Sequence, residues 1–307
     1  MSSHSANNCA APCEAAVRKV TEELTHVESL PALSAGGLSV PSHAAVRRIV
    51  DLCRTMLFPG FFGEAPVSRT GVAYHIGVAA EELIGLLKSQ IVASLGFCEA
   101  DPDNPQLHED AAEKARLFLA GMPQMRKVLA ADVEATFAGD PAAMSVEEVI
   151  FSYPGIRATI SHRIAHALTQ LDVPVLPRMV SELAHSETGI DIHPAATIGE
   201  GLMIDHGTGV VIGATAIIGR NVKIYQGVTL GARSFVRDSG NNLVKGLPRH
   251  PIVGDNVVIY SNATVLGRIT IGEGAVIGGN LWVTEDVAPG ERLVQSTADN
   301  ILRIKKS

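Results

Sequence analysis

The chain has 307 residues with 46% hydrophobic side chains, and these values predict a globular protein of one large or two medium domains. Its formal net charge is −7 and it has no stripe of lysine or arginine, so nucleic acid is not an expected partner. No apolar run approaches the roughly 18 residues of a membrane span and the N-terminus lacks the apolar core of a signal peptide, so we expect a soluble, cytoplasmic protein.

The N-terminal residues 1–13 are polar and are predicted to be mobile. The four cysteines all fall in the first third of the chain, at Cys9, Cys13, Cys53 and Cys98. They are too few to cross-link a chain of this length and include no CxxC pair, which favours a reducing compartment.

An α-helical domain is predicted over residues 14–185. Apolar residues recur there at helical spacing in six segments, which are 14–27, 42–57, 71–95, 108–122, 125–139 and 155–171. Ser42 follows Pro41 and is expected to cap the second helix. The last helix should end before Pro174 and Pro177, because proline interrupts an α-helix.

An aliphatic residue recurs every six positions in the second half of the chain. The positions are Ile192, Ile198, Ile204, Ile212, Ile218, Ile224, Leu230, Val253, Ile259, Val265, Ile271, Ile277 and Val283. This period is typical of a parallel β-helix, in which each aliphatic side chain points into a three-sided prism. Glycine often follows directly, and we expect it to support the turn geometry.

These hexapeptides predict about four coils and a prism about 20 Å tall. Two extra residues between 204 and 212 and a long excursion between 230 and 253 interrupt the register. We therefore predict a β-helix domain at 186–295 with an extended loop at 231–252, followed by a short tail at 296–307.

The repeat is broken at Asp205 and His206, which stand where a small turn residue is expected. A carboxylate and an imidazole cannot face an apolar lumen without a large free-energy cost, so both should point outward. The motif DIHP at 191–194 offers a second acidic–imidazole pair, and RHP at 249–251 closes the long loop. Histidine with a carboxylate partner suits general-base chemistry near neutral pH.

His162 and His166 lie four residues apart on a predicted helix, as metal ligands can. The glutamate of the zinc-protease pattern is missing between them. We interpret both as packing residues and predict no metal site.

The motifs together resemble one enzyme family. DIHPAATIGEGLMIDHGTGVVIGATAIIG, QGVTLGA, RHP and VLGRITIGEGAVIGG make the chain similar to serine O-acetyltransferases of cysteine biosynthesis over roughly residues 130 to 290. The resemblance implies an α+β protein in which an N-terminal α-helical domain precedes a left-handed parallel β-helix of hexapeptide repeats. It also implies transfer of the acetyl group of acetyl-CoA, the co-substrate, to the hydroxyl of L-serine.

The resemblance further assigns catalytic and acceptor-binding roles. His206 matches the general base, and Asp191 matches the carboxylate that orients its imidazole. Asp140 and Asp205 match positions that hold the substrate ammonium. Arg249 matches the position that pairs with the substrate carboxylate, where a planar guanidinium suits two oxygens.

Four further positions follow from the same resemblance. His250 matches a second imidazole lining the serine pocket. The backbone N–H of Ala232 matches a donor to the thioester oxyanion. Ser261 and Gly279 match positions beside the pantetheine arm of acetyl-CoA.

The family also implies a homotrimer, a dimer of trimers as the larger assembly, and L-cysteine as a feedback inhibitor. The chain departs from the family pattern at Ala214, where a glutamate is common, and in the length of its 231–252 loop. Its end, NILRIKKS, lacks the tail that docks into the sulfhydrylase partner, so that complex is not expected.

Other functions remain open from the residues alone. The chain could transfer an acyl group to homoserine, a sugar or another small hydroxyl or amine. A zinc-dependent carbonic anhydrase on the same prism would use His193, His206 and His250, and a non-catalytic scaffold would retain the prism only.

Overall fold

A computed structural model of the chain describes residues 10–25, 40–63, 68, 70–96 and 104–295. Predictions for residues 1–9, Cys9, Cys98 and the 296–307 tail lie outside the described residues. The chain divides into two compact units, 1–39 and 40–307. The first contains helix α1 (Ala10–Thr25), and no described helix is long and apolar enough to cross a lipid bilayer.

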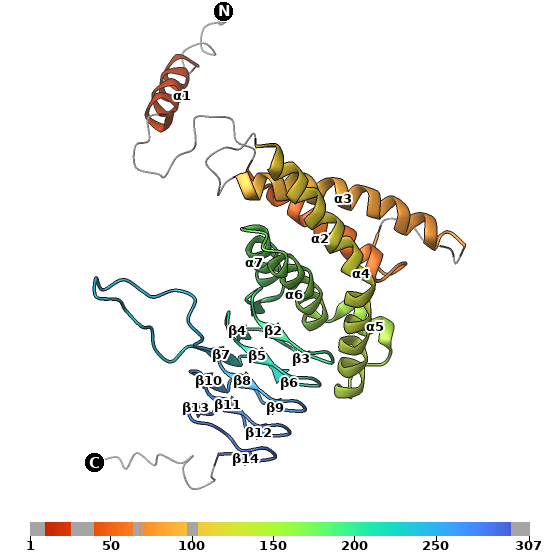
Figure 1. Ribbon diagram of the computed structural model, residues 1–307, viewed down its shortest axis with the longest axis vertical. Helices are drawn as coiled ribbons and strands as arrows, with labels where there is room; N and C mark the ends of the chain where they lie inside the picture. Colours follow the sequence, from red (N-terminus) through yellow and green to blue (C-terminus); the bar gives the residue numbers. More distant parts are fainter. Residues whose placement is uncertain (1–9, 26–39, 64–67, 69, 97–103, 296–307) are drawn as a thin grey trace, which may run out of the picture. The chain divides into compact units, whose positions relative to one another are not determined.

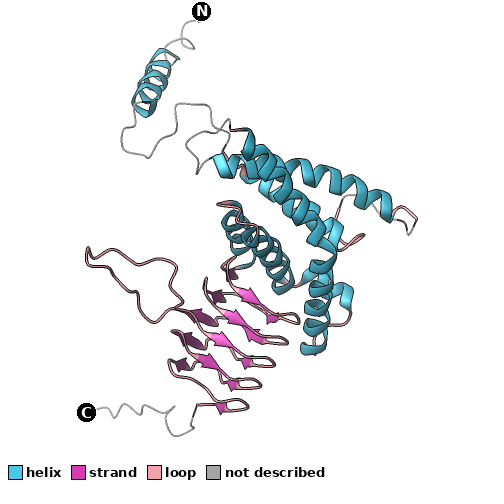
Figure 2. Ribbon diagram, viewed as in Figure 1, coloured by secondary structure: helices cyan, strands magenta, loops and turns pink. Residues whose placement is uncertain are grey.

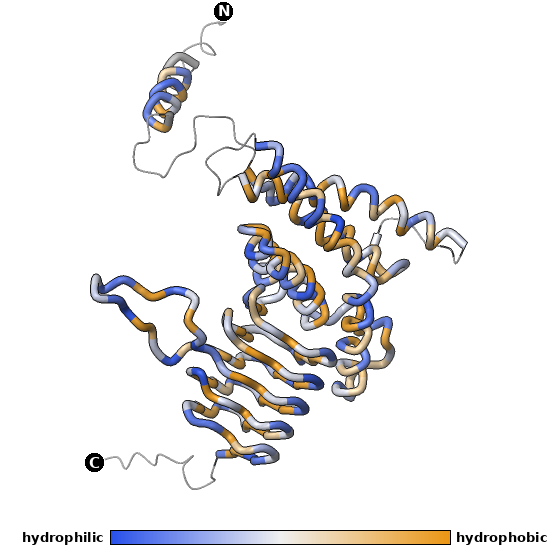
Figure 3. The backbone as a smooth tube through the Cα atoms, viewed as in Figure 1, coloured by the Kyte–Doolittle hydropathy of each residue, from blue (hydrophilic) through white to orange (hydrophobic). Residues whose placement is uncertain are grey.

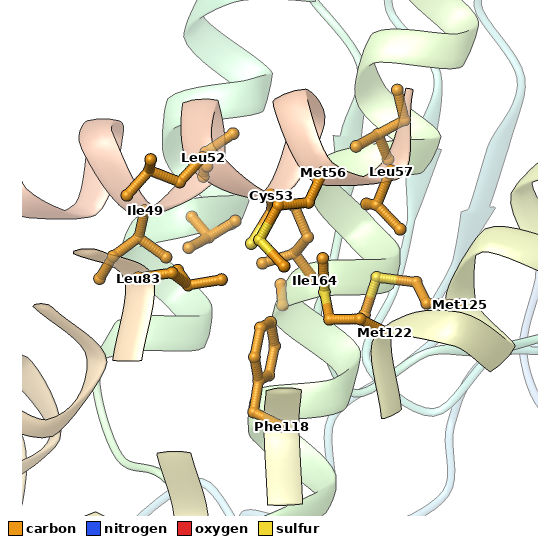
Figure 4. Packing of buried hydrophobic residues seen from close by; sticks show 14 of the residues in the cluster. Ile49, Leu52, Cys53, Met56, Leu57, Leu83, Phe118, Met122, Met125 and Ile164 are labelled. Carbon is orange, nitrogen blue, oxygen red and sulfur yellow. The ribbon is translucent and has the colours of Figure 1, made fainter. Parts of the chain in front are cut away.

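In its described residues the second unit begins with six helices, drawn from orange to green in Figure 1. They are α2 (His43–Leu57), α3 (Val72–Gly96), α4 (Pro105–Gly139), α5 (Val146–Ser152), α6 (Pro154–Gln170) and α7 (Leu176–Thr188). Ser42 caps α2 as predicted, since its side chain accepts from the Ala45 N–H. Buried side chains of α2, α3, α4 and α6 share one apolar core (Figure 4).

Helix α4 corrects the prediction of two helices at 108–122 and 125–139. It continues through Pro123, although proline removes one helical hydrogen bond. Met122 and Met125 on either side are buried in the core, and this packing holds the helix together across the proline. Two helices, α5 and α7, were not predicted.

The histidines of α6 pack as predicted. His162 is 2% exposed and its ring stacks on His166 with 5.6 Å between the ring centroids. Burial, with the nearby Arg163 charge, holds the pKa of His162 well below its usual value.

The β-helix follows α7 as fourteen short strands that Figure 2 shows stacked in flat coils. They are β1 (Asp191–Ile192), β2 (Thr197–Ile198), β3 (Met203–Asp205), β4 (Val211–Ile212), β5 (Ile217–Ile218), β6 (Lys223–Tyr225), β7 (Thr229–Gly231), β8 (Ile252–Val253), β9 (Val258–Ile259), β10 (Thr264–Leu266), β11 (Thr270–Ile271), β12 (Val276–Ile277), β13 (Trp282–Val283) and β14 (Arg292–Leu293).

All pairings between these strands are parallel and form three faces. The first face is β1-β4-β7-β10-β13, the second is β2-β5-β8-β11 and the third is β3-β6-β9-β12-β14. Every one of the thirteen predicted lumen residues lies in the buried prism core, and Figure 3 shows the recurring apolar positions. The predicted hexapeptide β-helix is therefore confirmed.

The prism extends one coil further than the predicted four. Val287 bridges to Ile271, and Leu293 pairs with Ile277 on the third face. The periodicity missed this coil because Val287 follows Val283 by four positions instead of six.

The glycines that follow the lumen residues serve close stacking of the coils. A Cβ on Gly219 would lie 2.7 Å from Asp255 N and 2.8 Å from Gly254 C of the next coil. Gly219 has no positive φ, so the expected role in turn geometry does not explain it.

The helical domain is joined to the prism by a buried ion pair. Asp132 on α4 accepts a hydrogen bond of 2.8 Å from the Leu202 N–H and binds Arg163 of α6 at 3.2 Å. Arg163 also donates to the Ile198 carbonyl. Because these contacts fix α4 and α6 against the prism, they determine where the ends of both helices lie.

The long loop between β7 and β8 forms an arm that leaves the prism in Figure 1. Arg237 pairs with Leu243 in an antiparallel bridge, and the Val244 N–H donates to the Val236 carbonyl at 2.9 Å. The arm therefore closes into a hairpin and returns to the prism at Arg249.

Candidate active site

The predicted site residues lie at two corners of the prism. The His206 corner comprises the turns from the third face to the first, which are 206–210, 226–228, 260–263 and 278–281. The His250 corner comprises the turns from the first face to the second, which are 193–196, 213–216, 232–251 and 267–269.

At the His206 corner, the side chain of His206 is exposed and that of Asp205 is half-buried. The prediction that both point away from the lumen is confirmed. His206 has a φ of 60°, a left-handed conformation that costs most residues free energy. Every other described non-glycine residue of the prism turns in this region is an asparagine, at 221, 256, 262 and 280, or at 241 in the arm.

The predicted Asp191 lies next to the turn that begins at His206. The Gly209 N–H donates to the Gly189 carbonyl at 2.8 Å, and the Asp191 N–H donates to the Val210 carbonyl at 2.9 Å. Asp191 and His206 thus flank one turn. Their side chains are not hydrogen-bonded to each other, and catalytic hydrogen bonds of unliganded enzymes often tighten only when substrate binds.

Asp140 lies close to Asp205, although 65 positions separate them in the numbering. Asp140 follows the last residue of α4, and a Cβ on Gly139 would lie 3.0 Å from the Met203 Cε of β3. Its Oδ2 accepts a hydrogen bond of 2.6 Å from the Tyr153 hydroxyl, and its Oδ1 accepts one of 2.8 Å from the Ala142 N–H. These two bonds, Tyr153 first, lower the pKa of Asp140.

The environment of Asp205 acts in the opposite direction. Burial, and then the negative charge of Asp140, raise its pKa. The two carboxylates therefore repel each other across a site open to an incoming cation. Such a site favours binding of an ammonium group.

Further down the same corner, Ser261 and Gly279 lie in adjacent coils. The Asn280 N–H donates to the Ser261 carbonyl at 2.9 Å, and a Cβ on Gly279 would lie 3.1 Å from that oxygen. A side chain at Gly279 would therefore crowd Ser261. Tyr225 and Tyr260 stack nearby with their ring centroids 5.1 Å apart.

At the His250 corner, the tautomer of His250 follows from its hydrogen bonds. Its Nδ1 accepts from the Thr215 N–H at 3.0 Å and from the Thr215 hydroxyl at 2.8 Å. That hydroxyl itself accepts from the Arg249 N–H at 2.9 Å, so its hydrogen is directed at Nδ1. The ring proton is therefore on Nε2, and neutral His250 presents a donor rather than a base.

His250 also stays neutral over a wide pH range. It is 6% exposed, and burial followed by the Arg249 charge lowers its pKa to about 4. The ring rests against Gly213, where any Cβ would collide with it.

Arg249 forms no ion pair with any residue that the structure describes. Its backbone is held by Thr215, while its Nε is buried and has no hydrogen-bond partner within the described ranges. One terminal nitrogen of the guanidinium donates a long hydrogen bond of 3.4 Å to the Leu247 carbonyl. A guanidinium without an ion-pair partner can receive a carboxylate in a bidentate geometry. Ala232, at the start of the same loop, donates no backbone hydrogen bond within the described chain.

The structure thus gathers the predicted residues into two sets, which lie at opposite edges of the first face. Asp140, Asp191, Asp205, His206, Ser261 and Gly279 belong to the His206 corner, and Ala232, Arg249 and His250 belong to the other. Among the described residues, no three His, Cys, Asp or Glu side chains form a group that could hold a metal ion.

A cavity of about 550 Å³ lies away from both corners, between α4, α6 and the turns that lead from the second face to the third. It contains none of the predicted site residues. Its walls include Phe118 and Met125. Volume by itself does not identify a binding or catalytic site, so we assign no function to this cavity.

Sequence reasoning missed Tyr153 and Thr215, which hold Asp140 and His250 respectively. Tyr153 stands directly before Pro154 and Gly155, at the boundary of α5 and α6. The Tyr-Pro-Gly sequence is typical of a change in backbone direction, but it does not indicate which carboxylate the phenol contacts.

Comparison with known proteins places these features in a family. A family model described as bacterial transferase hexapeptide (six repeats) matches residues 250–285. A plasmid-encoded serine acetyltransferase of Synechococcus elongatus is 46% identical over 262 residues, which are 84% of this chain and 82% of that protein. The serine acetyltransferase of Bacillus subtilis is 45% identical over 178 residues, 55% of this chain and 78% of that protein.

Solved structures agree with these matches. Serine acetyltransferase 1 of Entamoeba histolytica in complex with L-cysteine has a TM-score of 0.71 at 32% identity, covering 82% of this chain and 97% of that one. The Neisseria gonorrhoeae enzyme in complex with serine has a TM-score of 0.53 at 28% identity, covering 87% and 99%. The prism is accordingly the left-handed β-helix of hexapeptide repeats, and the chain belongs to the serine acetyltransferase family.

Proposed function

We propose that this protein transfers the acetyl group of acetyl-CoA to the hydroxyl of L-serine, giving O-acetylserine for cysteine biosynthesis. The observation that carries this proposal is the pair of carboxylates, Asp140 and Asp205, beside the exposed His206. A cation-binding pair next to an imidazole suits an acceptor that has both an ammonium and a hydroxyl group.

The acceptor is bound as a zwitterion. Asp140 and Asp205 hold its ammonium, and the guanidinium of Arg249, which has no ion-pair partner in the described chain, binds its carboxylate. Neutral His250 lines the pocket and donates from Nε2. A sugar acceptor would need neither the carboxylate pair nor the arginine, so these residues favour an amino acid over that alternative.

His206 acts as the general base. Its imidazole takes the proton of the serine hydroxyl as the oxygen attacks the thioester carbon, and returns that proton to the departing thiolate. Asp191, across the same turn, orients the ring and stabilises the imidazolium. A positioned base of this kind contributes about 10²- to 10⁴-fold in rate.

The thioester substrate is held by backbone and small residues. The Ala232 N–H, which has no partner in the described chain, donates to the oxyanion of the tetrahedral intermediate. Ser261 and Gly279 border the pantetheine arm, where the lack of a side chain at Gly279 leaves room beside the Ser261 carbonyl.

A complete site requires two copies of the chain. The His206 corner and the His250 corner lie at opposite edges of one face, so one edge of each copy must meet the other edge of its neighbour. In three copies related by a threefold axis, each His206 corner meets the His250 corner of a neighbour, which supports a homotrimer. A dimer of trimers, and cytoplasmic location, remain parts of this proposal.

L-Cysteine fits the same contacts, because it shares the ammonium and carboxylate of serine and differs at the reacting atom. The complex of the Entamoeba histolytica relative with L-cysteine supports its role as an inhibitor. We propose that it competes with serine here.

The proposal is tested by the rate of CoA release from acetyl-CoA with L-serine, L-homoserine or a hexose as acceptor. We expect L-serine to give the highest kcat/KM and L-cysteine to raise the KM for serine. Faster release with the hexose, or no release with L-serine, would contradict the proposed function.

A further inference from the structure

Tyr153 is the one phenol in direct hydrogen-bond contact with the carboxylate pair among the described residues. It lies between α5 and α6, is half-buried, and packs against the helical core. Its hydroxyl reaches across to the Oδ2 of Asp140 at 2.6 Å, a short bond of the kind made to a charged acceptor. The bond links the junction of α5 and α6 to the end of α4, beside the corner of the prism.

Asp140 is consequently held at both oxygens. The Ala142 N–H binds Oδ1 at 2.8 Å, and the phenol binds Oδ2. A carboxylate just beyond a helix end would otherwise rotate freely, and each rotamer would present a different lone pair. Both bonds favour the ionised form, and the same contact raises the pKa of Tyr153 to about 12, so the phenol remains a donor.

No side chain within the described residues supports Asp205 in this way, and its carboxylate accepts from the His206 backbone N–H. Its pKa is raised by burial and by Asp140, so one carboxylate of the pair is fixed and ionised while the other takes up a proton more readily. An arriving ammonium relieves the repulsion between them. The strength of that binding depends on Asp140 keeping its orientation.

We propose that Tyr153 is a positioning residue for acceptor binding, holding the Asp140 carboxylate in the orientation that receives the ammonium of the acceptor. This inference rests on the proposed function, since it assumes an acceptor with an ammonium group. The phenol acts through Asp140 and does not touch the reacting atoms.

Other charged or titratable groups also face this carboxylate pair. Those from the packed elements are Glu148 of α5, Lys223 and Tyr225 of β6, and His206 after β3. The test must therefore separate the effect of the phenol from theirs, and Tyr153→Phe does so because it removes one oxygen and keeps the ring.

We expect Tyr153→Phe to raise the KM for L-serine about three- to ten-fold, with kcat within about two-fold and the KM for acetyl-CoA unchanged. A raised KM for L-serine with an unaltered kcat and an unaltered KM for acetyl-CoA is the readout that a merely structural role of Tyr153 would not give.

A double-mutant cycle with Asp140→Asn decides whether the phenol works through the carboxylate. In the Asp140→Asn background, Tyr153→Phe should no longer change the KM for L-serine. Tyr74→Phe on the exposed surface of α3 is the matched control and should leave all constants unchanged.

An unchanged KM for L-serine in Tyr153→Phe would overturn the inference, as would an equal effect with and without Asp140. A loss of kcat together with thermal stability would also overturn it, by assigning Tyr153 a structural role alone. No turnover of L-serine by the wild-type protein would instead contradict the proposed function, so the two failures are distinguishable.

Discussion

His206 and His250 show how the same side chain acquires different chemistry from its surroundings. The side chain of His206 is exposed at a turn, so its imidazole is accessible to a substrate, as a proton acceptor needs. His250 is 6% exposed, and two donors from Thr215 occupy its Nδ1. One imidazole can therefore take a proton from a substrate, while the other can only donate from Nε2.

The depressed pKa of His250 predicts a pH effect on stability. An unfolded histidine takes up a proton near pH 6.5, whereas folded His250 does so near pH 4. The unfolded state binds more protons between these values, so His250 makes the free energy of unfolding decrease as pH falls from about 6.5 to about 4.

His250→Asn should reduce this acid sensitivity, because the amide oxygen can accept from Thr215 but does not titrate. The test is urea denaturation of both proteins at several pH values between 7 and 4.5. Parallel curves of stability against pH would contradict the assignment of this term to His250.

At the scale of elements, the prism is held by close stacking of its coils. Gly219 has backbone atoms of the next coil within 3 Å of the position of a Cβ, and those atoms cannot rotate away. Gly85 lies at an exposed position in the middle of α3, and a Cβ there would have no neighbouring atom within 4 Å. The two glycines differ in whether a methyl group can be accommodated.

Gly219→Ala should therefore destabilise the protein by about 1–3 kcal/mol, as overpacking does. Gly85→Ala should stabilise it by about 0.5–1 kcal/mol, because alanine loses less backbone entropy in a helix. Thermal unfolding of both variants measures the contrast. Equal shifts in Tm of the same sign would contradict the stacking argument.

The elements also show how far the sequence could predict the fold and site. All thirteen residues that the six-residue period predicted, from Ile192 to Val283, lie in the buried prism core, because each coil repeats the same environment. The same core also holds residues such as Leu202, Val210 and Val222, which the period did not mark. The period could not predict the fifth coil, where Val287 breaks the spacing. The helix predicted at 155–171 does end before Pro174, as α6 ends at Gln170. Proline gave no guide elsewhere, since Pro123 lies inside α4 and Pro177 stands in the first turn of the unpredicted α7.

The candidate site was predictable where residues broke a pattern. Asp205 and His206 interrupted the repeat, and the family motifs supplied the positions of Asp140 and Arg249. Tyr153 and Thr215 escaped because their contacts depend on how α4, α5 and the coils are packed. No local spacing records such contacts between distant segments.

At the scale of the whole molecule, the separation of the two corners has a direct consequence. Within one chain, His206 and Arg249 occupy opposite edges of the first face. If each site combines the His206 corner of one copy with the His250 corner of its neighbour, then His206 and Arg249 of the same chain belong to two different sites. A defect in one copy can then be complemented by a different defect in the next.

The most direct test is co-expression of His206→Ala with Arg249→Ala and assay of CoA release by the mixed assemblies. Each variant alone should be nearly inactive, His206→Ala by about 10²- to 10⁴-fold. Every mixed trimer would hold one intact site of three, and about three quarters of random trimers would be mixed, so about a quarter of wild-type activity should return. Mixed assemblies as inactive as the two parents would contradict an acetyl-transfer site shared between copies with His206 as its base.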